Sequence, residues 1–302
     1  MRHLFVAGLS VVLASLVACA PSSQDVPEEA PVSAPFESPY FTVTVMGSGP
    51  DVVLVPGLAS SAAVWDETVA ALSDRFTLHT VQVSGFADAP ARGNADNENV
   101  LDDLAADLVA YTNSLERSPA LVGHSLGGLV TLKAALDADA ELSRIVVVDV
   151  LPFFSVLMDE AATAESMAPV SAFMKATLLS QSDDIFALRQ SEALAALVKD
   201  DTDLQSALSW SVRSDRAVMA QAMSEVLVTD LREEVSAIEI PTTIIYARDE
   251  AIPNMPAVEQ FYQTLYAPLS NGSLVAIDGA LHFVMLDQPE AFLSALEKAL
   301  SD

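Results

Sequence analysis

A serine in a glycine-rich turn is the residue of this chain whose surroundings most clearly indicate chemistry. The stretch Gly123-His124-Ser125-Leu126-Gly127 follows a short apolar run and precedes residues with helical spacing. A serine on a sharp turn between a strand and a helix presents its hydroxyl at the end of the strand, and the flanking glycines leave room for close backbone approach. The pattern predicts that Ser125 is a nucleophile. The alternative is a serine that only caps the following helix.

A serine hydroxyl needs a general base, and the chain contains four histidines. His3 lies in an N-terminal segment that we expect to be removed, and His79 lies inside a predicted strand. His124 directly precedes Ser125, so its side chain is expected to point elsewhere. His282 lies in a loop between the last predicted strand and the final helix, where it can reach a distant serine. We therefore predict that His282 is the base.

A carboxylate that orients the histidine is expected at the end of a buried strand. Asp249 ends the apolar stretch at residues 241–249, where the chain turns outward. Asp149 follows another apolar stretch, and the end of that strand opens toward the same crevice. We predict Asp249 as the orienting carboxylate, with Asp149 as its rival.

Strand and helix patterns alternate along most of the chain. The interruption is a long stretch from Pro152 to about Thr229, which contains only Ala-, Leu- and Met-rich helical patterns. Predicted strands cover residues 40–50, 51–57, 76–83, 120–123, 144–150, 241–249 and 273–278, and predicted helices cover 61–72, 99–115, 125–138, 257–266 and 289–300. Alternation of this kind predicts an α/β fold, with a mostly parallel, doubly wound sheet covered by helices on both faces.

The serine turn, together with the chain order Ser125, Asp249, His282, resembles the α/β-hydrolase superfamily over roughly residues 40–300. The resemblance implies a hydrolase core at residues 40–151 and 230–302, with an inserted helical cap at residues 152–229. It also implies that the backbone amides of Leu58 and Leu126 form an oxyanion hole. Pro56 stands where the corresponding loop often begins His-Gly, a departure that leaves the backbone donors untouched.

The resemblance implies a serine hydrolase that cleaves a carboxylic ester through an acyl-enzyme, with no cofactor and no metal. Lactonase, aminopeptidase, carbon–carbon hydrolase and perhydrolase activities remain alternatives, because fold does not settle substrate. A non-catalytic binding lipoprotein or an envelope-assembly protein on the same scaffold is a further alternative.

The cap contains apolar residues that could line a substrate pocket or simply pack its helices together. They are residues 151–158, Met167, Met174, Met219 and Met223. Arg213 and Arg216 could meet a substrate carboxylate, although pairing with surface acids is the favoured interpretation.

The N-terminus has the pattern of an export signal. Residues 1–18 combine a basic start with an apolar run, and Leu16 to Cys19 resemble the lipobox of bacterial lipoproteins. Cys19 is the only cysteine, so we predict that it is lipidated; an ordinary cleaved signal with an incidental cysteine is the alternative. Residues 19–39 are rich in Pro, Ser and Glu and are expected to form a disordered tether. We therefore expect an anchored protein of the bacterial cell envelope, facing the periplasm or the exterior.

Composition limits the classes of partner. Hydrophobic residues make up 51% of the 302 residues, enough for a sizeable core, and a single cysteine permits no internal disulfide. The net charge of −28 excludes nucleic acid as a partner. Such acidity is typical either of proteins from salty environments or of soluble exported proteins. The expected partners are a small apolar ester or acyl compound and, through the lipid, a membrane.

Overall fold

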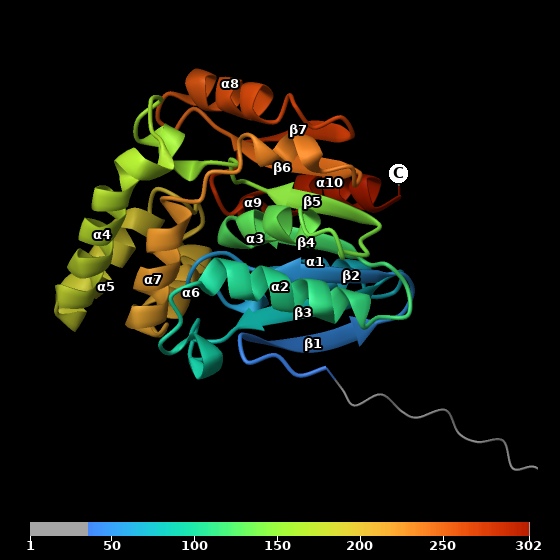
Figure 1. Cartoon of the computed structure of the whole chain (residues 1–302), viewed down its shortest axis with the longest axis horizontal. Helices are drawn as coiled ribbons and strands as arrows, with labels where there is room; N and C mark the ends of the chain where they lie inside the picture. Colours follow the sequence, from blue (N-terminus) through green and yellow to red (C-terminus); the bar gives the residue numbers. More distant parts are fainter. Residues whose placement is uncertain (1–35, 302) are drawn as a thin grey trace, which may run out of the picture. The chain divides into compact units, whose positions relative to one another are not determined.

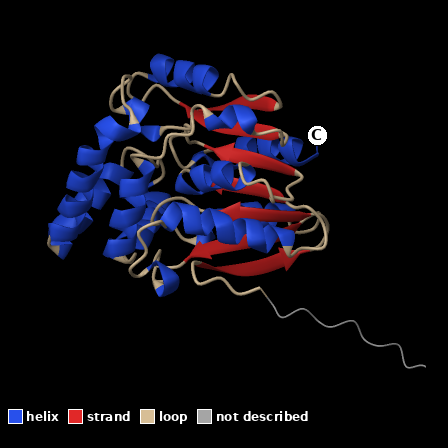
Figure 2. Ribbon diagram, viewed as in Figure 1, coloured by secondary structure: helices blue, strands red, loops and turns tan. Residues whose placement is uncertain are grey.

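A seven-stranded sheet organises the chain. The computed structural model describes residues 36–301, and its strands, red in Figure 2, lie in the order β1-β3-β2-β4-β5-β6-β7 (labelled in Figure 1). β1 pairs antiparallel with β3, and every other neighbouring pair is parallel. The strands are β1 (Phe41–Gly47), β2 (Asp51–Val55), β3 (Thr77–Val83), β4 (Ala120–His124), β5 (Arg144–Val148), β6 (Thr242–Arg248) and β7 (Gly272–Asp278). The predicted doubly wound, mostly parallel sheet is confirmed.

The apolar runs of the central strands explain why helices cover both faces. On β2, Val53 and Val55 belong to the apolar cluster that includes residues of α2, α3 and α8, whereas Val52 and Leu54 belong to a second cluster that includes residues of α1 and α10. Successive side chains of a strand point to opposite faces, so a strand that is apolar at every position requires cover on both sides. The flanking helices are α1 (Asp66–Leu72), α2 (Val100–Asn113), α3 (Leu126–Ala135), α8 (Met255–Leu265), α9 (Val284–Asp287) and α10 (Pro289–Ser301), with short 3-10 turns at Ala62–Trp65 and Arg92–Asn94.

Four helices, which we call the cap, lie between β5 and β6 near the carboxyl ends of the parallel strands (Figure 1). They are α4 (Ala164–Ser180), α5 (Asp183–Leu194), α6 (Asp201–Val212) and α7 (Arg216–Val226), flanked by 3-10 turns at Phe154–Leu157 and Glu234–Ala237. Each begins after a side chain that accepts a hydrogen bond from a first-turn amide, namely Thr163, Ser182, Asp200 and Asp215. Such caps each stabilise a helix by about 0.5–2 kcal/mol, so the sequence itself sets where the cap helices start.

The cap is fastened to the core through α7. The carboxylate of Glu225 accepts hydrogen bonds from the amides of Val100 at 2.9 Å and Leu101 at 2.8 Å, the first two residues of α2. The side chain of Asn99, which precedes α2, accepts no hydrogen bond from the first amides of the helix, so Glu225 of α7 supplies the acceptor instead. Burial raises the pKa of Glu225, and the bonds from these amides oppose that shift.

The chain packs on the core earlier than the sequence predicts. The ring of Phe36 lies 5.3 Å from that of Tyr111 and 6.1 Å from that of Phe41, and Ser38 Oγ donates to Asp107 at 2.6 Å. The tether prediction is therefore wrong for residues 36–39, because an aromatic ring and a hydroxyl find partners there. The predicted signal peptide, Cys19 and the rest of the tether lie outside the described residues. None of the helices between residues 36 and 301 is long and apolar enough to cross a membrane.

Candidate active site

Ser125 occupies a strained turn between β4 and α3. Its backbone has φ 55° and ψ −120°, a conformation that costs a non-glycine residue about 1–3 kcal/mol. The hydrogen bond from its amide to the carbonyl of Val148, at 2.9 Å, ties the turn to the end of β5.

Two glycines allow the turn to form. A Cβ on Gly123 would lie 2.1 Å from the carbonyl oxygen of Gly127, and one on Gly127 would lie 2.5 Å from the carbonyl oxygen of Val55. Neither position accepts a larger residue without movement of the backbone. The glycine spacing in the sequence therefore reflects close approach, as expected.

The loop after β2 lies directly against Ser125. A Cβ built on Gly57 would lie 3.1 Å from Cβ of Ser125, so Leu58 follows a residue in contact with the turn. Leu126 is the first residue of α3, and its amide has no acceptor within the helix. In the described part of the chain, the amides of Leu58 and Leu126 donate to no protein acceptor. Two free N–H groups beside a serine can stabilise a developing oxyanion.

His282 is paired with Asp149. Its Nδ1 lies 2.8 Å from Asp149 Oδ2, and both side chains are largely buried. The imidazole also lies 4.6 Å from the ring of His124, the residue before Ser125. The ends of β4 and β5 and the loop after β7 therefore bring the serine, the carboxylate and the imidazole together.

The prediction that Asp249 orients His282 is wrong. Asp249 Oδ2 lies 2.5 Å from Lys199 Nζ, and its other oxygen accepts the amide of Ala251 at 2.8 Å. The hydrogen bond with Lys199 holds the pKa of Asp249 below its ordinary value. Asp149, the rival, occupies the position beside the histidine.

Strand register explains the difference between the two acids. Val148, the last residue of β5, pairs with Ile245, so β6 runs on to Arg248 beyond the end of β5. Asp149, the first residue after β5, therefore still lies beside β6. Asp249 comes only after β6 has ended, further along the sheet than the ends of β4 and β5.

Two further groups hold the carboxylate of Asp149. Its Oδ1 accepts the amide of Ala247 at 2.8 Å and the hydroxyl of Tyr262 at 3.1 Å. The ring of Tyr262 stacks between those of Tyr246 and Tyr266, which fixes the hydroxyl in place. Burial, followed by the charge of Asp149, raises the pKa of Tyr262 well above its ordinary value, so the hydroxyl remains a donor. No local pattern in the sequence indicates this role.

The side chain of His124 supports the loop that carries His282, a role that the sequence analysis did not identify. It is fully buried, and its Nε2 lies 3.0 Å from the carbonyl oxygen of His282. Burial, followed by the nearby His282, lowers the pKa of His124 well below its ordinary value. The ring is therefore neutral, with Nε2 as the donor to the carbonyl.

The other sequence candidates have packing or surface roles. Arg213 forms an ion pair with Asp88, and Arg216 pairs with Asp183 at 2.6 Å, which agrees with the favoured interpretation. Met167 is buried in the core cluster that Met174 and Met223 also contact, and Met219 packs with Phe186 and Ala59. His79 is buried between Tyr111 and Asp51.

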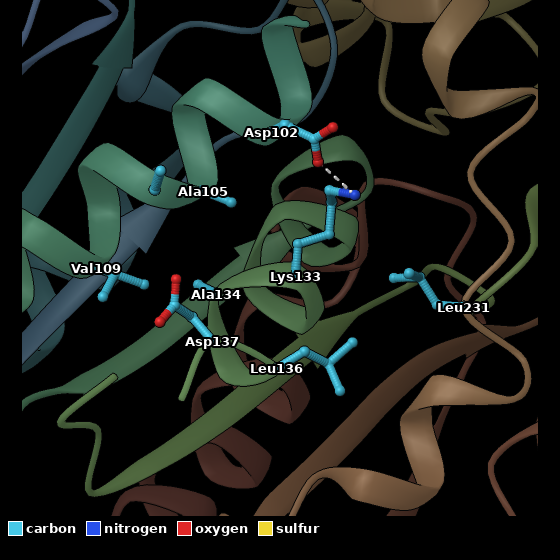
Figure 3. A pocket seen from close by; sticks show the side chains of 9 residues that line it. Asp102, Ala105, Val109, Lys133, Ala134, Leu136, Asp137 and Leu231 are labelled. Atoms are coloured by element: carbon cyan, nitrogen blue, oxygen red, sulfur yellow. Dashed lines mark ion pairs between the residues drawn. The ribbon is translucent and has the colours of Figure 1, made fainter. Parts of the chain in front are cut away.

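A surface cavity of about 250 Å³ lies away from Ser125, between α2 and α3 (Figure 3). Its wall includes the ion pair of Lys133 and Asp102, 2.6 Å apart. Lys133 is in the last turn of α3, about 12 Å along the helix from the serine turn. No group of three or more His, Cys, Asp or Glu residues within 36–301 could hold a metal ion.

Comparison with known proteins identifies the family. A family model described as "Alpha/beta hydrolase family" matches residues 52–295, which include every site residue described above. The chain belongs to the alpha/beta hydrolase family.

Among curated relatives of this hydrolase are proteins named pimeloyl-[acyl-carrier protein] methyl ester esterase. The one from Aliivibrio fischeri is 26% identical over 260 residues, covering 84% of this chain and 95% of the relative. The one from Vibrio atlanticus is 30% identical over 243 residues, covering 74% and 90%. The chain therefore matches nearly the whole length of relatives that are named as esterases.

Solved structures support the fold. The enol-lactonase from Burkholderia xenovorans superposes with a TM-score of 0.70 at 19% identity, covering 87% of this chain and 96% of the other. A hydrolase from Pseudomonas aeruginosa gives a TM-score of 0.71 at 21% identity, covering 87% and 94%.

The two acids make a matched pair of variants. Asp149→Asn should lower kcat for ester hydrolysis by on the order of 10⁴-fold, because the amide favours the wrong tautomer of His282. Asp249→Asn should leave kcat close to the wild-type value, because that carboxylate pairs with Lys199 and makes no contact with His282. Steady-state kinetics with p-nitrophenyl acetate measures both. A large loss in Asp249→Asn with an active Asp149→Asn would contradict the assignment.

Proposed function

We propose that this hydrolase is a serine esterase that acts through Ser125, His282 and Asp149. The observation that carries the proposal is the 2.8 Å contact between His282 Nδ1 and Asp149 Oδ2 beside the strained Ser125 turn. A scaffold that only binds ligands requires neither the strain nor the paired carboxylate. The esterase names of the relatives support the same conclusion.

The proposed reaction has two halves. Ser125 Oγ attacks the carbonyl carbon of the ester while His282 Nε2 takes its proton, and Asp149 stabilises the imidazolium through Nδ1. The amides of Leu58 and Leu126 hold the oxyanion, and each such donor typically stabilises the transition state by about 2.7–4 kcal/mol. His282 then protonates the leaving alcohol and activates water, which releases the acid from Ser125.

We propose carboxylic esters of small alcohols with an apolar acyl group as substrates. The relatives are named for a methyl ester, which supports a small leaving group. Phe186 and Met219 of the cap form an apolar cluster with Ala59 and Leu58, so the part of the cap next to the proposed oxyanion hole is apolar. An apolar wall there favours an uncharged acyl chain.

Covalent labelling with a fluorophosphonate tests the activated serine. The signal-free protein should take one label, which mass mapping places on Ser125, and the label should be lost in Ser125→Ala and His282→Ala. Circular dichroism of each variant controls for folding. Folded wild type without label, or label that persists in Ser125→Ala, would contradict the proposal. Methyl esters, lactones and aminoacyl amides, compared by kcat/KM, then separate esterase from the alternative activities.

We further propose that Cys19 carries a lipid that anchors the protein to a bacterial envelope membrane. The support is the sequence alone: an apolar segment that ends Leu16-Val17-Ala18-Cys19, and the absence of any other cysteine in the chain. From Cys19 to Pro35 there are 17 residues, which permit a maximal reach of about 60 Å to the folded unit.

Radiolabelled palmitate tests the anchor in a bacterial host that produces the full chain. We expect incorporation into the wild type and none into Cys19→Ser, because the lipid has no other thiol to modify. Ser125→Ala serves as a control and should be labelled like the wild type. Absence of label from the wild type, or label that persists in Cys19→Ser, would refute the anchor while leaving the esterase proposal intact.

A further inference from the structure

The loop that carries His282 has no regular secondary structure, so its shape depends on the partners of its peptide groups. Three backbone groups of residues 281–283 have partners in three different parts of the chain. The amide of Leu281 donates to Asp287 Oδ2 at 2.7 Å, the carbonyl of His282 accepts from His124, and the amide of Phe283 donates to the carbonyl of Leu197 at 3.2 Å. The peptide group that follows the histidine, His282–Phe283, is therefore held at both its carbonyl and its amide, and the Ala280–Leu281 peptide is held at its amide.

One of these partners belongs to the cap. Leu197 begins a short segment, residues 197–199, that follows α5 and that we call the cap turn. Val198 is buried in the same apolar cluster as Phe283, so the cap turn packs against the residue that follows the histidine.

Asp287 connects the cap turn to the loop that carries His282. Its Oδ1 accepts the amide of Lys199 at 2.9 Å while its Oδ2 accepts the amide of Leu281 at 2.7 Å. Both donors are backbone N–H groups bound to one carboxylate, and charge-assisted bonds of this kind are stronger than neutral ones. The ammonium group of Lys199 pairs with Asp249 instead, so the carboxylate of Asp287 serves the two amides.

We propose that Asp287 is a positioning residue for His282, and that it makes the position of the imidazole depend on the cap turn being in contact with the core. The inference rests on the proposed function of His282 as the general base. Asp287 touches neither substrate nor reacting atoms; it acts by fixing the amide of Leu281, the residue that precedes the histidine. When the cap turn moves away, Asp287 loses the hydrogen bond from the amide of Lys199, and the amide of Phe283 loses its acceptor on Leu197. General base catalysis thereby becomes conditional on a closed cap, which limits activation of Ser125 when the site is open.

The kinetic test compares Asp287→Asn and Asp287→Ala with Glu290→Gln, which removes a charge from an exposed residue three positions later. We expect kcat for p-nitrophenyl acetate to fall on the order of tenfold to a hundredfold in Asp287→Asn, and further in Asp287→Ala, because a small misplacement of a catalytic group is costly. KM should change little, and Glu290→Gln should match the wild type. Activity of Asp287→Asn equal to that of the wild type would overturn the proposal. So would a rise in KM for longer esters with kcat for the acetate unchanged, which would show a role in the cap alone.

Amide hydrogen exchange supplies a readout that does not need activity. Asp287→Asn should speed exchange in the peptides that contain Lys199 and Leu281, and Glu290→Gln should not. Urea unfolding checks that both variants remain folded. Unchanged exchange at both amides would contradict the bridge. If the wild type takes no fluorophosphonate while Asp287→Asn still speeds exchange at both amides, the proposed function fails and the bridge stands, so the two failures are distinguishable.

Discussion

The hydrogen-bond register of β4, β5 and β6 is the constraint on which the site depends. His124 pairs with Val148, and Val148 pairs with Ile245, so three neighbouring strands reach one edge in step. The hydrogen-bond ladder continues one residue further, because the amide of Ser125 donates to the carbonyl of Val148 and the amide of Asp149 donates to the carbonyl of Ile245. A slip of one residue in either pair would turn side chains to the opposite face and separate the serine from its carboxylate.

Much of the fold follows from the sequence because its signals are local. The continuous apolar run Val52–Val55 requires cover on both faces, and the side chains of Thr163, Ser182 and Asp215 mark where cap helices begin. Ser125 is readable for the same reason, since its glycines and flanking elements are all within a few residues. His282 follows from elimination among four histidines.

The remaining site residues act through contacts between distant parts of the chain. Asp149 and His282 are 133 positions apart, and Tyr262 reaches Asp149 from 113 positions away. The choice between Asp149 and Asp249 depends on how far β6 extends past β5, which neither strand's own sequence states. His124 illustrates the same limit: its position beside Ser125 is local, but its contact with the His282 carbonyl is not. Phe36 and Ser38 escaped prediction because their partners lie on α2.

The most direct test of this account is proton NMR of the hydrogen bond between His282 and Asp149. An imidazole N–H held by a buried carboxylate gives a low-field resonance that exchanges slowly with water, and His282→Ala assigns it. We predict that the resonance is present in the wild type, survives Asp249→Asn and is lost in Asp149→Asn. Survival in Asp149→Asn with loss in Asp249→Asn would show that the register argument is wrong and that Asp249 holds the histidine.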